Sequence, residues 1–303
     1  MERRKFLRNT GIIAGFGVIA QQQAVAQLFG VPQNKIRMLR NNVGIYTERG
    51  GTIGFVLSPE GIVVIDSQFA DTATSFINEI KKTNTTPFKF LLNTHHHGDH
   101  TSGNISFKGL VSNVIAHENS LANQKRTAEA QNALDKQLLP DLTFKNEEFK
   151  LKMDKQKIKG YYFGAGHTNG DAVYFIEDAN VAHLGDLMFN RRHPFVDRSS
   201  GANIGSWIKV LDKVIKKGDK NTMYIFGHSR VPGAETGSAE DVKMFQDYLS
   251  KLMAFTETEI KAGKTKEEFI KNTAIPGVTE WIGDGIARPL TAAYEELTEA
   301  KKA

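Results

Sequence analysis

The stretch Thr94-His95-His96-His97-Gly98-Asp99-His100 decides how this sequence is interpreted. It holds four of the nine histidines of the 303-residue chain and directly follows the apolar run 88–92, which we expect to form a buried strand. Side chains two residues apart on an extended segment project to the same side, so His95, His97 and Asp99 would converge. A turn after them would bring in His100. The stretch therefore predicts a metal site at a strand end.

A helix is the alternative conformation for the same stretch. His96 and His100 would then share one face, as in the helical two-histidine zinc motif. Gly98 and Asp99 disfavour a helix, however, and no glutamate follows the first histidine to act as a base. The extended conformation is favoured, with a turn at Gly98–Asp99.

Three further short motifs place residues of metal-ligand type beside expected strands. Each lies in a glycine-containing loop, where functional side chains are usually positioned by a rigid scaffold. The motifs are Gly166-His167-Thr168-Asn169-Gly170-Asp171 before a strand at 172–176, Gly185-Asp186 after a strand at 181–184, and Gly227-His228 after a strand at 223–226. No one of these motifs is specific for a metal site. Their order along the chain and their shared ligand-type residues are the evidence for one.

The amino-acid composition limits which metal-binding and catalytic groups the chain can use. The chain is 40% hydrophobic and 24% charged, as in ordinary globular proteins. It has no cysteine, which excludes disulfides, a cysteine nucleophile, iron–sulfur clusters and thiolate metal sites. Any metal must therefore be held by histidine and carboxylate.

The first 26 residues are interpreted as a bacterial export signal of the twin-arginine type. Arg3-Arg4-Lys5-Phe6-Leu7-Arg8 precedes a mildly apolar stretch, and Ala24-Val25-Ala26 supplies a small-x-small cleavage site. The apolar stretch is about half the ~20 residues that a membrane span needs, so no stable span is expected. Without this segment the formal net charge falls from +5 to +2, which argues against nucleic acid as a partner. The predicted domain covers residues 27–303 and is periplasmic or secreted.

Hydrophobic periodicity predicts clusters of short strands separated by single helices, an α/β arrangement of mixed sheets covered by helices. The expected helices are 70–82, 119–139 (stopped by Pro140), 204–217, 238–261, 264–271 and 285–302. We find no internal repeat and no clear domain boundary. From about residue 238 the chain is expected to be a helical C-terminal extension.

Taken together, the four motifs resemble the metallo-β-lactamase-fold hydrolases, over about residues 43–228. The resemblance implies a four-layer αβ/βα sandwich, in which two mixed β-sheets face each other with helices on the outer faces. It also implies two zinc ions per chain. His95, His97 and His167 would hold the first, Asp99, His100 and His228 would hold the second, and Asp186 would bridge them.

The same resemblance implies a metal-dependent hydrolase acting on a small molecule. A metal-bound hydroxide would attack an ester-type bond in a lactone, thioester or β-lactam, with Asp99 orienting it and relaying its proton. The best-known antibiotic-hydrolysing subclass has a cysteine in the second site, where this chain has none. Glyoxalase-II-like thioesterases and lactonases are therefore the nearer branches. A mononuclear iron persulfide dioxygenase and a phosphodiesterase are the alternatives.

Several other residues have weaker roles in this interpretation. Hydrogen bonds to the ligating histidines are expected from Thr94 and Asp66, and for Thr168 and Asp171 this role and ordinary turn capping are equally favoured. His96, His117 and His183 are interpreted as structural residues. For the Arg191-Arg192-His193 loop, a solvated basic loop is slightly favoured over a binding site for a substrate anion.

Overall fold

The protein is described from a computed structural model that covers residues 35–153 and 156–299. The predicted export signal lies outside the described residues. Contacts divide the chain into residues 1–35 and 36–303, and the fold below is that of the second unit. Among the described residues, no helix has both the length and the apolar character needed to cross a membrane.

The first sheet has seven strands in chain order. Strands β1 to β4 are antiparallel, and β4 to β7 are parallel. They are β1 (Ile36–Met38), β2 (Val43–Tyr46), β3 (Ile53–Ser58), β4 (Gly61–Ile65), β5 (Phe88–Leu92), β6 (Asn113–His117) and β7 (Leu142–Phe144).

The second sheet has six strands in the order β15-β13-β11-β10-β9-β8. Only the β11–β13 pair is parallel. A separate parallel pair, β12 with β14, aligns Phe189 with His228. The strands of this sheet and of the separate pair are β8 (Glu148–Met153), β9 (Gln156–Tyr161), β10 (Val173–Ile176), β11 (Val181–His183), β12 (Phe189–Asn190), β13 (Met223–Ile225), β14 (His228–Ser229) and β15 (Thr236–Gly237).

Alternation along the strands separates three hydrophobic clusters. In β4, Val63 and Ile65 join the cluster shared by both sheets, whereas Ile62 and Val64 face the cluster that holds α2 (Ala70–Thr83). This is the two-residue period of a strand whose two faces are both covered. The third cluster joins the outer face of the second sheet to α5 (Ile204–Lys217), α6 (Ala239–Lys261) and α8 (Ala287–Glu299).

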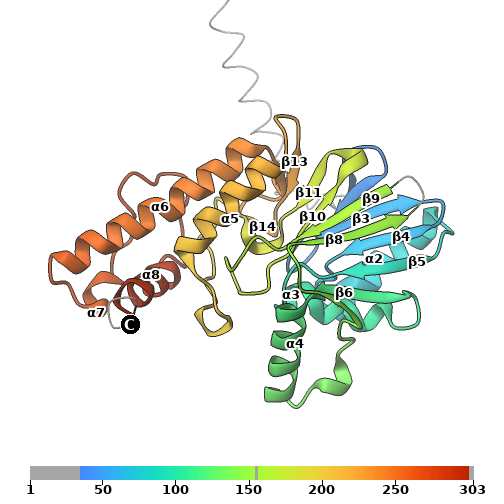
Figure 1. Cartoon of the computed structure of the whole chain (residues 1–303), viewed down its shortest axis with the longest axis horizontal. Helices are drawn as coiled ribbons and strands as arrows, with labels where there is room; N and C mark the ends of the chain where they lie inside the picture. Colours follow the sequence, from blue (N-terminus) through green and yellow to red (C-terminus); the bar gives the residue numbers. More distant parts are fainter. Residues whose placement is uncertain (1–34, 154–155, 300–303) are drawn as a thin grey trace, which may run out of the picture. The chain divides into compact units, whose positions relative to one another are not determined.

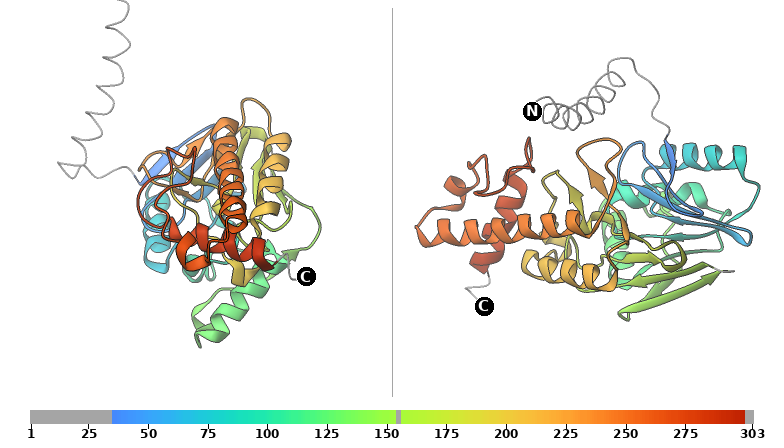
Figure 2. Two further views of the ribbon diagram at one scale, coloured as in Figure 1. Left: turned by 90° about the vertical axis from the view of Figure 1, so that its left-hand side faces the viewer. Right: turned by 90° about the horizontal axis from the view of Figure 1, so that it is seen from above.

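These clusters create four layers, with helix, sheet, sheet and helix in succession. The right-hand view of Figure 2 shows the two sheets face to face with α2 outside the first, and Figure 1 shows α5 and α6 beside β11 and β13. The predicted fold class, an αβ/βα sandwich of two mixed sheets, is confirmed.

Two expected helices are shorter than predicted: the helix expected at 264–271 is only α7 (Lys266–Phe269), and the helix expected at 119–139 also ends early. Helix α4 (Glu118–Ala130) ends nine residues before the predicted end. Asn132 adopts the left-handed conformation with φ of 50°, which ends the helix well before Pro140. The other short helical segments are α3 (Gly98–Thr101) and 3-10 turns at Ser102–Phe107, Leu134–Lys136, Glu177–Ala179, Gly185–Leu187 and Arg198–Ser200.

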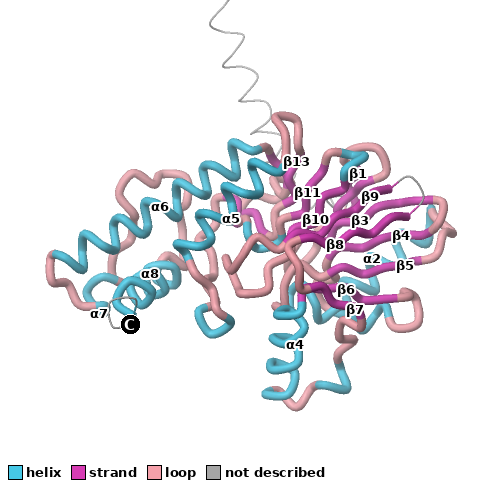
Figure 3. The backbone as a smooth tube through the Cα atoms, in the orientation of Figure 1, coloured by secondary structure: helices cyan, strands magenta, loops and turns pink. Residues whose placement is uncertain are grey.

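The C-terminal helices α6, α7 and α8 lie together beyond the strands (Figure 3). Helix α8 supports α5 through Glu296, a buried carboxylate. Glu296 accepts hydrogen bonds from the backbone N–H groups of Ile204 at 2.7 Å and Gly205 at 2.9 Å. These are two of the donors that the first turn of a helix leaves unpaired. The carboxylate therefore caps α5 from a distant part of the chain.

We expect Glu296→Ala to lower the free energy of unfolding by ~1–3 kcal/mol, because both capped N–H groups would be left unpaired in a buried position. Urea denaturation followed by circular dichroism measures this change. Glu299→Ala is the matched control, since this exposed carboxylate forms an ion pair with Arg198 and caps no helix among the described residues, and it should cost less than ~0.5 kcal/mol. Equal losses in the two variants would contradict the capping role.

Candidate metal centre

The four motifs meet at one edge of the two sheets. His95 to His97 follow β5, and Asp186 lies in the 3-10 turn after β11. The backbone N–H of Gly227 donates to the carbonyl of Gly185 at 2.8 Å, which holds the loop after β13 beside the loop after β11. Loops that leave strand ends at one edge thus bring together residues that are far apart in the sequence.

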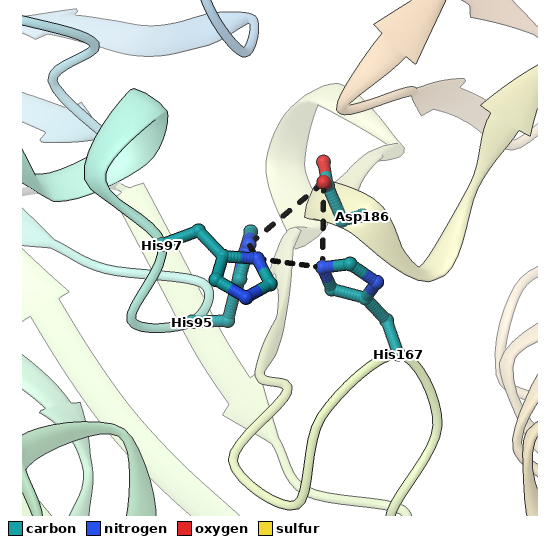
Figure 4. A group of neighbouring side chains, drawn as sticks. All are labelled: His95, His97, His167 and Asp186. Carbon is teal, nitrogen blue, oxygen red and sulfur yellow. Dashed lines mark hydrogen bonds and ion pairs between the residues drawn. The ribbon is translucent and has the colours of Figure 1, made fainter. Parts of the chain in front are cut away.

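His95, His97, His167 and Asp186 form the first group. Their ligand-type atoms all lie within 4.8 Å of one another. Nδ1 of His97 is 3.1 Å from Nε2 of His95 and 2.9 Å from Nε2 of His167. Figure 4 shows the three rings and the Asp186 carboxylate directed at a common centre.

Asp99, His100 and His228 form the second group, again within 4.8 Å. Nε2 of His228 lies 3.1 Å from Oδ2 of Asp99. Asp186 joins the two groups, because its carboxylate is 2.9 Å from Nε2 of His100 and 3.3 Å from Nε2 of His228. In the first group, the same carboxylate is 3.5 Å from Nε2 of His167.

Local backbone structure makes room for these side chains. A Cβ atom at Gly227 would lie 2.1 Å from Oδ1 of Asp186, and one at Gly51 would lie 2.1 Å from the ring of His100. Any other residue at these two positions would push the carboxylate or the imidazole out of place. The backbone is therefore shaped around the cluster.

Buried charge and hydrogen bonding also fit a bound cation. Burial, helped by neighbouring imidazoles, lowers the pKa of His95 and His167, that of His167 to about 3, so both are neutral as metal ligands must be. Burial opposes the charge on Asp186, but His228 and His100 outweigh it and lower its pKa. Oδ1 of Asp186 is buried without a hydrogen-bond donor. Imidazole nitrogens and carboxylate oxygens without sulfur suit zinc.

Hydrogen bonds from neighbouring residues orient the rings of His95 and His100. Oδ2 of Asp66 accepts from Nδ1 of His100 at 2.8 Å and from the hydroxyl of Thr94 at 2.7 Å. Because the Thr94 hydroxyl is used as a donor there, its oxygen accepts from Nδ1 of His95 at 3.0 Å. The contacts expected for Thr94 and Asp66 are present. Each leaves Nε2 of its histidine free to face the centre.

Contacts with ligating histidines, one of the two roles expected for Thr168 and Asp171, are absent. The hydroxyl of Thr168 donates to Oδ1 of Asp171 at 2.6 Å, and its backbone N–H donates to Oδ2 at 2.9 Å. These two residues close their own turn, the capping role that short polar side chains take in loops. The carbonyl of Phe195 supplies the contact instead, accepting from Nδ1 of His167 at 2.7 Å.

Asp197 is a site residue that the sequence did not indicate. Its Oδ2 accepts from Nε2 of His97 at 3.0 Å, across 100 residues of chain. The same carboxylate lies 3.5 Å from Nε2 of His96, and these three residues form a third group of ligand type. The only local signal is a cap: Oδ1 accepts from the backbone N–H of Ser200. That signal marks a turn and says nothing of a distant histidine.

We expect Asp197→Asn to weaken metal binding ~10–100-fold, the usual cost of losing a partner of a ligating histidine. The amide oxygen can replace Oδ1 in the turn, but the amide group offers N–H where His97 needs an acceptor. Competition with a chromophoric chelator measures the affinity. Ser199→Ala, which removes a different hydrogen bond to Asp197, is the control and should bind metal as wild type does.

The local conformation of the first motif differs from the prediction. Thr94 and His95 form a bend after β5 and His97 has an extended backbone, but Gly98 and Asp99 begin the helical turn α3, with His97 at its N-cap position. A turn opened by an acidic residue is favourable at a helix N-terminus, which the expectation for Gly98–Asp99 overlooked. His96 precedes this turn, so the helical two-histidine alternative is wrong.

The other histidines and the arginine loop have structural contacts. Nε2 of buried His183 donates to the carbonyl of Thr52 at 3.0 Å, and His117 caps α4. His193 contacts the hydroxyl of Tyr248 at 3.0 Å. Arg191 is held in ion pairs and is not free to bind a substrate anion.

Comparisons with known proteins show which protein family this chain matches. Residues 46–228 match the model of the metallo-beta-lactamase superfamily, a range that holds every residue of both groups. A type 2 metallo-beta-lactamase from Bacillus cereus is 24% identical over 207 residues, which cover 65% of this chain and 77% of that protein. A hydroxyacylglutathione hydrolase from Methylococcus capsulatus is 29% identical over 102 residues, 33% of each chain.

Solved structures extend the likeness beyond the matched range. A metallo-beta-lactamase from Pontibacter korlensis superposes with a TM-score of 0.58 at 20% identity, over 72% of this chain and 99% of that one. A sec-alkylsulfatase from Pseudomonas sp. superposes with a TM-score of 0.67 at 14% identity, over 86% of this chain and 49% of that one. At these identities the likeness shows the fold alone.

Proposed function

Because this chain belongs to the metallo-beta-lactamase superfamily, we propose that it is a hydrolase that binds two zinc ions and cleaves an ester-type bond in a lactone, thioester or β-lactam. The observation that supports this most directly is the pair of ligand groups joined by one carboxylate. His95, His97 and His167 would hold one ion, and Asp99, His100 and His228 the other. Asp186 lies within reach of both sets.

The bound ions would supply an activated water and polarise the bond to be cleaved. The residues around them keep the site ordered, because Asp66, Thr94, Asp197 and the Phe195 carbonyl fix four imidazole rings. Asp99 has a separate role. Its side chain is 31% exposed, so its carboxylate faces incoming water and can orient it. Burial works against the Asp99 charge, but His100 and His228 lower its pKa to about 2, so it is an acceptor at neutral pH.

The test is a hydrolysis panel with purified, zinc-loaded protein, using nitrocefin, a homoserine lactone, an acyl-glutathione thioester and bis-nitrophenyl phosphate. We expect turnover of at least one of the first three, loss of it with a chelator, recovery with zinc, and two zinc ions per chain by elemental analysis. One iron per chain would favour the persulfide dioxygenase alternative. Turnover of the phosphate diester alone would favour the phosphodiesterase.

We also propose that residues 1–26 direct export, so that the enzyme works in the periplasm or outside the cell. Support comes from the Arg3-Arg4 pair and the Ala24-Val25-Ala26 cleavage pattern. N-terminal sequencing of the protein recovered from a periplasmic extract should begin at Gln27. An uncleaved chain confined to the cytoplasm would contradict the proposal.

A further inference from the structure

The arginines near the second ligand group differ in their pairing. Arg191 is held at 2.7 Å from Glu280 and 3.0 Å from Asp241, and its guanidinium lies over Trp281. Arg230 is exposed and, in residues 35–153 and 156–299, has no carboxylate within ion-pair distance. Its charge is therefore available to a ligand.

Arg230 lies beside the candidate metal centre. It follows His228 by two residues, and its backbone N–H donates to the carbonyl of Asn190 at 2.9 Å, which continues the pairing of β12 with β14. Arg230 is therefore the first residue after β14, in a bend that directly follows the strand carrying His228. A Cβ atom at Gly283 would be 4.0 Å from the guanidinium carbon, which places the 281–285 loop next to it.

Exposed apolar side chains occur in the loops next to Arg230 and in the loop that contacts the first ligand group. Among the described residues, six large hydrophobic side chains are exposed, and three of them belong to these loops. Phe195 is 44% exposed and its ring lies 5.5 Å from that of His97. Val231 (48% exposed) follows Arg230, and Ile282 (55% exposed) precedes Gly283. We call Phe195, Val231 and Ile282 the apolar rim.

Neither the unpaired charge of Arg230 nor the exposed apolar rim stabilises the fold. An exposed hydrophobic side chain gains nothing from solvent, and an unpaired arginine adds no ion pair. Together they match a molecule that has an apolar segment and an anionic group, since guanidinium groups bind oxyanions with directed N–H donors.

We propose that the substrate is an amphiphilic anion: an ester-type molecule with an apolar acyl chain and an oxyanion on its leaving group, bound by the apolar rim and by Arg230. This inference rests on the proposed hydrolase function. Water would cleave the bond between the acyl carbon and the leaving oxygen, giving a carboxylate, an anionic alcohol and one proton. We assign the acyl chain to the side of the first group, because Phe195 of the apolar rim lies against His97, and the oxyanion to the leaving group, because Arg230 follows His228 of the second group.

The first experiment compares three octanoyl esters, of 4-hydroxybenzenesulfonate, 4-hydroxybenzoate and neutral 4-nitrophenol, together with 4-nitrophenyl acetate. We expect Arg230→Ala to lower kcat/KM for the two anionic esters ~10-fold or more relative to the neutral octanoyl ester, as expected for loss of a charge-assisted hydrogen bond. Ratios of variant to wild type cancel the different leaving-group reactivities. The sulfonate and benzoate arms show which oxyanion is preferred.

Two further variants complete the comparison. Ile282→Ser together with Val231→Ser should reduce the preference for octanoyl over acetyl several-fold, because each methylene buried on an apolar surface contributes about fourfold. Arg288→Ala is the control: it is also an exposed arginine, but lies in the first turn of α8, outside the apolar rim and the segment after β14, and should leave all four ratios unchanged.

A binding measurement separates the inference from the proposed function. Isothermal titration calorimetry with the non-hydrolysable ether 4-(octyloxy)benzenesulfonate should show ~10-fold weaker binding to Arg230→Ala and wild-type binding to Arg288→Ala. Hydrolysis with equal losses on neutral and anionic esters, and ether binding that does not depend on Arg230, would overturn the inference and leave the hydrolase standing. Arg230-dependent binding by a protein that hydrolyses neither these esters nor nitrocefin, the lactone or the thioester of the panel would overturn the proposed function alone.

Discussion

Asp186→Asn should abolish hydrolysis and leave the protein with fewer than two zinc ions per chain. The carboxylate lies 2.9 Å from His100, 3.3 Å from His228 and 3.5 Å from His167, so it is the one side chain shared by both ligand groups. An amide keeps the shape but removes the negative charge that would offset two nearby cations. The loss should exceed the ~10–100-fold that follows removal of a mere partner of a ligand.

Metal content by mass spectrometry and kcat/KM on the best substrate of the panel measure the Asp186→Asn effect. Glu235→Gln is the matched control. Glu235 is also a buried carboxylate, but it pairs with Arg37 instead of histidines, so this variant should retain two zinc ions and full activity. An Asp186→Asn protein that keeps both ions and wild-type turnover would remove Asp186 from the site.

Periodicity could predict mixed sheets covered by helices because the causes are local, whereas the four-layer sandwich was predicted from the resemblance of the four motifs to a known family. Strand β4 alternates residues between two apolar clusters, and α2 presents one apolar face, so periodicity in the sequence reports both. The convergence of the four motifs was also predictable, since each adjoins a strand end. Their role as metal ligands stays a prediction, which the panel and the variants test.

What escaped prediction depends on long-range contacts or on single backbone conformations. Asp197 reaches His97 only because the loop after β12 folds back over the centre. The early end of α4 depends on the left-handed conformation of Asn132, a state that asparagine adopts readily but that no periodicity reveals. Glu296 caps α5 across more than ninety residues. Sequence patterns report neighbours along the chain, not those partners.

Asp99→Asn should separate catalysis from folding. Unlike Asp186, which is 4% exposed, Asp99 is 31% exposed and its nearest partner is Nε2 of His228 at 3.1 Å. His228 keeps Asp186 as a carboxylate partner at 3.3 Å, and the amide oxygen can take the place of the lost carboxylate oxygen, so the free energy of unfolding should change by no more than ~1 kcal/mol. Losing the group that orients water and accepts its proton should lower kcat ~10²–10⁴-fold, measured at saturating zinc so that weaker metal binding does not contribute.

Asp71→Asn is the control for Asp99→Asn, because Asp71 is also an aspartate paired with a basic side chain, although it is more exposed and its partner is Arg49. It should leave kcat unchanged. If Asp99→Asn at saturating zinc also retains wild-type kcat, the water-orienting role is wrong and the carboxylate serves only to hold His228. If kcat falls while the two unfolding curves coincide, the exposed carboxylate acts in the reaction and not in the fold, because a structural role would shift the curve.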